Sequence, residues 1–121
     1  MNKILIVDDS STVRDEVVGY FTKNGVTAIS ATDGLAGFKA VANDSDIKLI
    51  LSDVNMPNMD GLTMVEKIRS ELKSDVVVIM LTTESSASMK DRGKASGVKG
   101  WIVKPFKGDA VLPTVKKILG L

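Results

Sequence analysis

Short, largely apolar runs alternate along the chain with longer segments in which apolar residues recur every three or four positions. The short runs have the length and content of buried strands, and the longer segments have the spacing of amphipathic helices. The predicted strands are residues 4–7, 27–30, 47–51, 76–81 and 101–103. Because strands and helices alternate across short connections, the pattern predicts an α/β fold with a parallel sheet and helices on both faces.

The helices are predicted from the positions of their apolar residues. The first spans residues 11–23, with a hydroxyl residue at position 10, 11 or 12 to cap its start and Asn24-Gly25 to end it. The second helix opens at Asp33-Gly34. The positions expected to face inward are Val13, Val17, Tyr20 and Phe21 in the first helix, Leu35, Phe38 and Val41 in the second, Leu62, Val65, Ile68 and Leu72 in the third, and Val111 or Leu112, Val115, Ile118 and Leu119 in the last.

The fourth helix, expected over residues 85–96, fits the pattern poorly. The segment holds four serines, an internal Gly93 and few large apolar groups. A glycine inside a helix costs roughly 1 kcal/mol relative to alanine, so we expect this helix to be the weakest. Thr82, Thr83 or Ser85 can cap it. It is either a thinly packed surface helix or a segment that moves or meets a partner, because mobile regions belong to the low-stability end of a structure.

Composition limits the functions that the chain can have. Its 121 residues fit a single domain, residues 1–121. A formal net charge of +1 gives no strong general attraction to nucleic acid, so we expect no direct DNA binding. No apolar run reaches the roughly 18 residues of a membrane span, and none near the start is long enough for a signal peptide. We therefore expect no membrane association and a cytoplasmic location. The absence of cysteine and histidine excludes disulfides, thiolate chemistry and a histidine general base.

Polar residues follow four of the predicted strands directly. Asp8 and Asp9 follow the first strand, Asp53 the third, Thr82 the fourth and Lys104 the fifth. Each residue alone would suggest an ordinary helix cap or surface side chain. In open α/β sheets, however, ligands bind beyond the carboxyl ends of the strands. The coincidence at four strand ends therefore favours one common site.

Three carboxylates at one edge of a sheet call for a compensating positive charge. Two unit charges about 4 Å apart repel by roughly 4 kcal/mol at an effective dielectric constant near 20. Oxygen ligands favour a hard cation such as Mg²⁺, which uses one or two carboxylates and is often completed by phosphate oxygens. Lysine serves as a point charge for phosphate, and aspartate can accept a phosphoryl group covalently. The residues together predict an aspartate that is phosphorylated with the help of Mg²⁺.

Four segments resemble those of response-regulator receiver domains at the right separations: residues 4–10 (ILIVDDS), 49–61 (LILSDVNMPNMDG), 78–82 (VIMLT) and 100–106 (GWIVKPF). The resemblance covers the whole chain and is strongest to stand-alone CheY-like receivers. It implies a flavodoxin-like, doubly wound sheet of five parallel strands in the order 2-1-3-4-5 with five helices. It also implies a two-component signalling switch of the chemotaxis type, which is a phosphoacceptor and not an enzyme with an external substrate.

The resemblance assigns roles to the residues of the site. Asp53 would be the phosphoacceptor, Thr82 would move toward the phosphoryl group, and Lys104 would form an ion pair with it. The implied ligands of Mg²⁺ are Asp9, Asp53, the backbone carbonyl of Asn55 and, mainly through water, Asp8.

Further positions are implied to tune the switch. Trp101 stands where the family carries its switch aromatic, although simple packing would also explain it. Asn55 and Glu84 would set the rate at which the phosphoryl group is lost. Thr83 replaces the small residue usual in the family, and we expect it to narrow access to the site. The bond between Lys104 and Pro105 is expected to be cis, as in the family.

Two other functions fit part of the pattern. A receiver-like module that docks a partner without being phosphorylated would not need the acids, Thr82 and Lys104. A haloacid-dehalogenase-like phosphatase would need a second acid where Ser10 stands. The expected partners are a histidine kinase, a phosphatase and a downstream target, which would be a motor switch, a kinase complex or a phosphotransfer protein. The chain is expected to be a monomer.

Overall fold

The computed structural model describes residues 1–121, in which five strands alternate with five helices. The strands are β1 (Lys3–Val7), β2 (Thr27–Ala31), β3 (Ile47–Ser52), β4 (Val77–Thr82) and β5 (Gly100–Val103). The helices are α1 (Ser11–Lys23), α2 (Gly34–Asn43), α3 (Gly61–Glu71), α4 (Ala87–Ala95) and α5 (Gly108–Leu119). The sheet order is β2-β1-β3-β4-β5, and all neighbouring strands are parallel. The predicted fold class and strand order are therefore confirmed.

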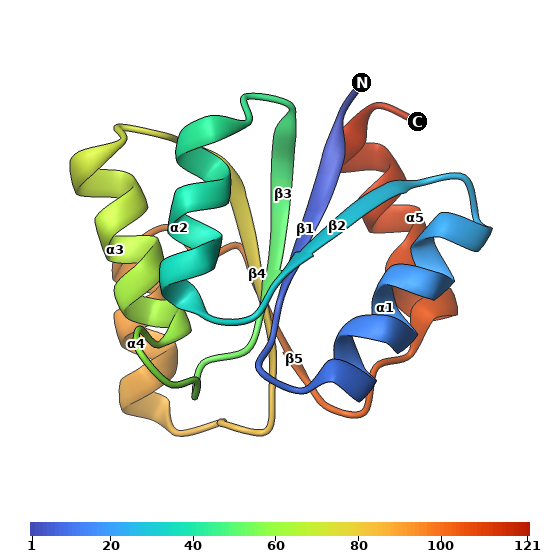
Figure 1. The fold of residues 1–121 in the computed structure, drawn as a ribbon. Helices are drawn as coiled ribbons and strands as arrows, with labels where there is room; N and C mark the ends of the chain where they lie inside the picture. The colour runs from blue at the N-terminus through green and yellow to red at the C-terminus, as the bar shows by residue number, and fades with distance from the viewer.

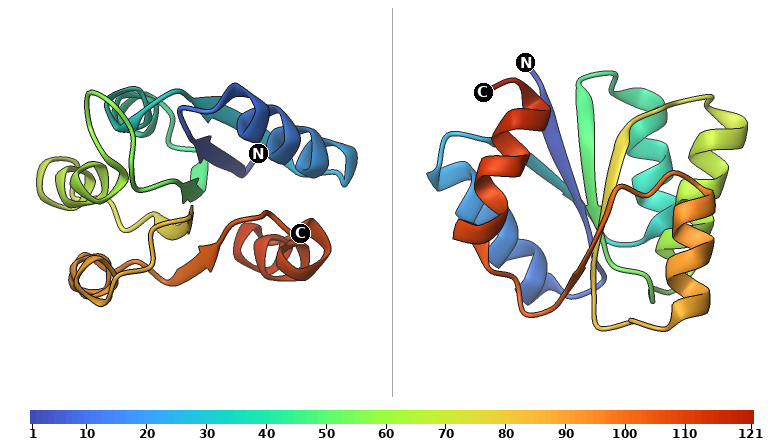
Figure 2. Two further views of the ribbon diagram at one scale, coloured as in Figure 1. Left: turned by 90° about the horizontal axis from the view of Figure 1, so that it is seen from below. Right: turned by 180° about the vertical axis from the view of Figure 1, so that it is seen from behind.

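Helices cover both faces of the sheet. Helices α1 and α5 lie on one face and α2, α3 and α4 on the other (Figure 1). The view along the strands shows the sheet between these two layers (Figure 2). Successive residues of β1 alternate between two cores: Leu5 and Val7 pack toward α2 and α3, whereas Ile4 and Ile6 pack toward α1 and α5. Burial on both faces explains why the strands are apolar at consecutive positions.

Four helices begin with a side-chain cap. The caps are Ser10, Asp33, Asp60 and Ser86, each of which accepts a hydrogen bond from a backbone N–H in the first turn. Helix α1 ends at Lys23; Asn24 caps its C-terminus, and Gly25 follows with a φ of 80° in the left-handed region that favours glycine. None of the helices combines the length and apolar character needed to cross a membrane.

One residue that was predicted to lie in the core is exposed. Leu35 was expected to face inward, but 40% of it is exposed. Helix α2 instead turns its two glycine positions, Gly34 and Gly37, to the interior, where both are buried. A side chain at Gly37 would collide with Met64 and Val7, so the helix lies unusually close to its neighbours there. Apolar periodicity gives no weight to glycine and so missed this packing face.

Helix α4 is shorter than expected. It runs over Ala87–Ala95, and its cap is Ser86, whose Oγ accepts from the backbone N–H of Met89 at 3.4 Å. Its only buried residue is Gly93, fewer than in any other helix. The expected capping residues Thr82, Thr83 and Ser85 therefore do not cap the helix. Thr82 still belongs to β4, and the chain needs the intervening residues to turn from the strand to the helix.

Candidate functional site

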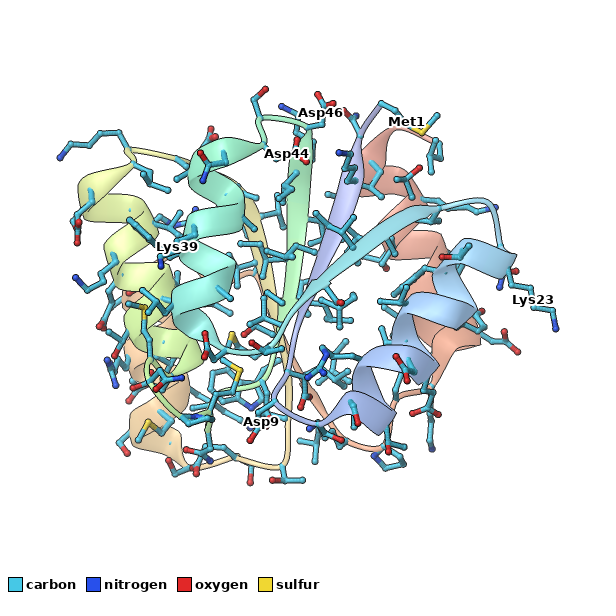
Figure 3. The ribbon with its side chains drawn as sticks, in the orientation of Figure 1. Met1, Asp9, Lys23, Lys39, Asp44 and Asp46 are labelled. Atoms are coloured by element: carbon cyan, nitrogen blue, oxygen red, sulfur yellow. The ribbon has the colours of Figure 1, made fainter.

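The three predicted acids meet at the carboxyl edge of the sheet. One carboxylate oxygen from each of Asp8, Asp9 and Asp53 can be chosen so that all three lie within 4.8 Å of one another. Figure 3 shows Asp9 at this edge, at the opposite end of the molecule from Met1 and Asp46. The parallel order of β1 and β3 brings the acids together, because neighbouring parallel strands end at the same edge.

Lys104 bridges two of these acids. Its Nζ lies 2.9 Å from Oδ2 of Asp8 and 3.0 Å from Oδ2 of Asp53. The exposed fractions of the side chains are 3% for Asp8, 11% for Asp53 and 19% for Lys104, so little water separates the charges. Burial by itself lowers the pKa of Lys104, but hydrogen bonds and charge from the two acids outweigh it and raise that pKa above its ordinary value. Asp9 is exposed and forms no ion pair with this lysine.

Backbone groups fix the two inner carboxylates. The N–H of Ser10 donates to Oδ1 of Asp8 at 2.9 Å, and the N–H of Val54 donates to Oδ1 of Asp53 at 2.7 Å. Arg14, which the sequence analysis did not single out, donates from Nη1 to the backbone carbonyl of Asp8 at 2.6 Å. A long side chain in the first turn of a helix points back toward its N-terminus, and that direction was the only sequence signal for Arg14.

The loop after Asp53 turns back sharply. The N–H of Gly61 donates to the carbonyl of Val54 at 2.8 Å, and a side chain at Gly61 would collide with the carbonyl of Asp53. A glycine is therefore required where α3 begins. We call residues 54–60 the β3–α3 loop. It carries Asn55, which is exposed and follows Asp53 by two residues.

Thr82 and Trp101 both bind the backbone of Glu84. The hydroxyl Oγ1 of fully buried Thr82 accepts from the N–H of Glu84 at 3.1 Å. The indole Nε1 of Trp101 donates to the carbonyl of Glu84 at 2.8 Å. The Trp101 ring lies against Gly93 of α4, where an added Cβ would come within 3.1 Å of Cζ3. Hydrogen bonds to the backbone of Glu84 thus connect the end of β4 with Trp101, and Trp101 in turn packs against α4.

The residues expected to tune the site lie on its outer side. Thr83 is exposed and Glu84 is half-buried. Hydrogen bonds from the side chain and the backbone N–H of Ser86 lower the pKa of Glu84, and the side chain of Asn55 contributes to the same shift. Asn55 lies in the loop after β3 and Glu84 in the loop after β4. Lys104–Pro105 is cis, as expected.

The donor set suits a magnesium ion. All three converging side chains offer carboxylate oxygens, and no nitrogen or sulfur ligand is among them. The cluster already draws the ammonium group of Lys104 to two of its members. Oxygen-only clusters favour Mg²⁺ or Ca²⁺ over zinc and copper. The cluster therefore fits a hard divalent cation such as Mg²⁺.

The acidic cluster reaches the surface of the molecule through Asp9, which is exposed, whereas Asp8 and Asp53 are buried. A hollow of about 580 Å³ lies at the opposite edge of the sheet, where Asn2, Asp44 and Asp75 are among its lining residues. None of the acids of the cluster lines this hollow.

Comparisons with known proteins agree with this arrangement. Residues 4–116 match the response regulator receiver domain family. A chemotaxis protein CheY homolog of Campylobacter jejuni is 35% identical over 120 residues, which cover 98% of this chain and 92% of that protein. The structure of the Vibrio cholerae chemotaxis protein CheY4 has 36% identity and a TM-score of 0.87, with 98% of each chain covered. A chain in the CheX–CheY–BeF3–Mg²⁺ complex of Borrelia burgdorferi has 30% identity and a TM-score of 0.86, with 97% of this chain and 88% of that chain covered. The chain therefore belongs to the response-regulator receiver family, the phosphoacceptor proteins of two-component signalling.

Proposed function

We propose that Asp53 accepts a phosphoryl group from a phosphohistidine of a histidine kinase. A carboxylate oxygen of Asp53 forms the new bond to phosphorus while the bond from phosphorus to the imidazole nitrogen breaks. The imidazole nitrogen leaves with the electron pair and takes a proton from solvent. The donor must be on a partner, because this chain contains no histidine.

The observation that carries the proposal is the position of Nζ of Lys104 between the carboxylates of Asp8 and Asp53. One oxygen of Asp53 lies 3.0 Å from Nζ of Lys104, at an edge where 11% of the side chain is exposed. A phosphoryl group adds roughly −1.5 to −2 charges, part of which an ammonium group at this distance offsets. The exposed part of the Asp53 side chain lets the donor approach, and the nearby cation keeps the product in place.

Mg²⁺ would be held by Asp9, Asp53 and the backbone carbonyl of Asn55, with Asp8 acting mainly through water. Bound there, the ion supplies positive charge for the phosphoryl oxygens. The chain's own contribution is to hold the acids in place through the N–H groups of Ser10 and Val54. In this way the protein assists its own phosphorylation and dephosphorylation, and Asn55, Glu84 and Thr83 at the rim would set those rates.

Thr82 and Trp101 supply the link to the surface. In this structure Thr82 Oγ1 is occupied by the N–H of Glu84. When Thr82 moves toward a phosphoryl group on Asp53, that N–H loses its acceptor and the loop before α4 shifts. Trp101 donates to the carbonyl of Glu84 and packs against α4, so a shift of Glu84 moves Trp101 and with it the helix.

The surface formed by α4, β5 and α5 is the proposed binding site for the downstream target. A groove of about 220 Å³ between α4 and β5 is lined by Lys90, Lys94, Lys99 and the edge of Trp101, among others. The groove changes with α4, because Trp101 lines the groove and packs against Gly93 of that helix. The target would be a chemotaxis motor switch, a kinase complex or a phosphotransfer protein. A phosphatase would be a further partner, and the CheX–CheY complex of Borrelia burgdorferi contains a similar chain bound to a second protein. Residues 1–121 act as one monomeric receiver unit in this proposal.

Incubation with acetyl phosphate and MgCl2, followed by intact-mass measurement and peptide mapping, tests the assignment. The wild type should gain one phosphoryl group on Asp53, and Asp53→Asn should gain none while it remains folded. Asp46→Asn, which changes an exposed acid at the opposite edge, is the matched control and should be phosphorylated like the wild type. A wild type that gains no phosphoryl group would favour the phosphorylation-independent docking module.

A further inference from the structure

The start of α2 is bonded to the middle of the β3–α3 loop. Asn58 donates from Nδ2 to Oδ2 of Asp33 at 2.7 Å, while Oδ1 of Asp33 caps α2 by accepting from the N–H of Ala36 at 2.8 Å. Beside this bond, the N–H of Gly34 donates to the carbonyl of Met59 at 2.9 Å. One carboxylate therefore serves a helix and a distant loop at the same time.

The local backbone is shaped for this contact. Asn58 has a φ of 67°, in the left-handed region that few residues other than glycine and asparagine adopt readily. A side chain at Gly34 would collide with the carbonyls of Met59 and Asp60. Asp33 itself is only 9% exposed. The start of α2 and the β3–α3 loop can approach this closely only because position 34 is a glycine and Asn58 adopts a positive φ.

Hydrogen bonds to residues nearby in the sequence hold the two ends of the β3–α3 loop. The carbonyl of Val54 accepts from the N–H of Gly61, and Asp60 caps α3 through the N–H of Thr63 at 2.8 Å. The hydrogen bonds that reach the middle of the loop from another part of the chain are those of Asp33 and Gly34. The backbone between Val54 and Asn58 includes Asn55, whose carbonyl is the proposed magnesium ligand.

We propose that the Asp33–Asn58 hydrogen bond is a positioning device for the Asn55 carbonyl. Mg²⁺ requires near-ideal octahedral geometry, so a ligand on a loosely held loop must be ordered when the ion binds, and that ordering weakens binding. Asp33 and Asn58 touch neither the ion nor the phosphoryl group; they act through the loop. This inference rests on the magnesium site of the proposed function.

The first test replaces Asn58 by glycine, which accepts the positive φ but cannot donate to Asp33. Titration with MgCl2 in a calorimeter should give a dissociation constant roughly 10-fold higher than that of the wild type, the lower end of what losing an orienting partner costs a metal site. Hydrogen exchange of the metal-free variant should show faster exchange of the Gly34 N–H. Asn24→Gly, which removes a side-chain hydrogen bond at the far end of α1, is the control and should leave the dissociation constant unchanged.

The second test exchanges the two side chains, Asp33→Asn together with Asn58→Asp. Asn at position 33 still caps α2 through its oxygen and now donates from its amide to Asp at position 58, so the bond is reversed and the net charge is kept. Magnesium affinity should return to the wild-type value. The exchange also tests the bond in case Asn58→Gly fails to fold.

Unchanged magnesium affinity in Asn58→Gly would overturn the inference. So would an exchange variant that binds as weakly as Asn58→Gly, because the bond itself would then not matter. A wild type that does not bind Mg²⁺ would overturn the proposed magnesium site as well. The wild-type titration therefore separates failure of the proposed function from failure of this positioning role.

Discussion

At Lys104, burial and charge pairing act in opposite directions. Burial disfavours the ammonium ion, and the two acids within 3.0 Å favour it more strongly. The lysine is therefore part of the stability of the metal-free protein as well as a proposed contact of the phosphoryl group. Removing it would leave two poorly exposed carboxylates without their partner.

Lys104→Met, which keeps most of the unbranched side chain without its charge, should lower the free energy of unfolding by about 1–3 kcal/mol in the absence of Mg²⁺. Saturating MgCl2 should recover much of the loss, since the ion supplies the missing positive charge. Urea unfolding with and without the salt measures both effects. Lys107→Met removes an exposed lysine three residues further along and should change little; equal losses in the two variants would contradict the pairing argument.

Asp9→Ala should have the opposite effect on the metal-free protein. Asp9 lies beside Asp8 and Asp53 without an ion pair of its own, so its charge adds repulsion. Its exposure to water limits the gain in unfolding free energy to roughly 1 kcal/mol. Magnesium binding should weaken in the same variant. Thermal unfolding in EDTA checks the first effect, and a lower melting temperature than that of the wild type would contradict the repulsion argument.

At the scale of elements, α4 is held more by polar contacts than by burial. Only Gly93 is buried, but Arg92 donates from Nε and Nη2 to the two oxygens of Glu66 on α3, both at 2.8 Å. The same guanidinium donates to Oγ1 of Thr63 at 3.0 Å, and that hydroxyl donates to Asp60 at the start of α3. A helix held in this way can shift without opening a hydrophobic core, as the proposed switch requires.

A double-mutant cycle with Arg92→Met and Glu66→Gln should measure a coupling of about 0.5–1 kcal/mol in unfolding free energy. The two side chains are 38% and 41% exposed, which keeps the value below that of a buried pair. The pair Lys67 and Glu71, one turn apart on α3, is the control and should give a smaller coupling. No coupling between Arg92 and Glu66 would show that packing against Trp101 holds α4 instead.

At the scale of the molecule, the helices on both faces of the sheet hold the strands in place, and the charged residues of the site lie at the carboxyl edge of that sheet. Both cores lie along the strands, and the acids lie beyond the ends of β1 and β3. The free energy of the folded molecule is therefore linked to whatever cation binds at that edge. Binding to the folded state alone stabilises it in proportion to the logarithm of ligand concentration.

MgCl2 at 100 times its dissociation constant should raise the free energy of unfolding by about 2.7 kcal/mol, because the acids converge only in the folded chain. Asp53→Asn should show a much smaller increase, and Asp46→Asn the full one. Urea unfolding at constant ionic strength, adjusted with NaCl, measures the effect. A wild type whose stability is the same with and without MgCl2 would contradict a magnesium site at this edge.

The residues of the site could be named in advance because a simple geometric rule connects them. Asp8, Asp9, Asp53 and Lys104 each follow a strand directly, and parallel strands end at one edge. The rule says nothing of contacts made by loops and helix turns. Arg14, the pair of Asp33 and Asn58, and the hydrogen bonds around Glu84 were missed for that reason.

The sequence by itself determined the alternation of strands and helices and the place where the acids, the hydroxyl and the lysine follow them, because periodicity and strand ends are local properties. Only the tertiary structure decided which partner each charge takes, that α2 packs by its glycines with Leu35 exposed, and that α4 begins at Ala87. Those features depend on how closely backbones approach and on which side chains meet across distant segments. That information is in the arrangement of the elements and not in any one of them.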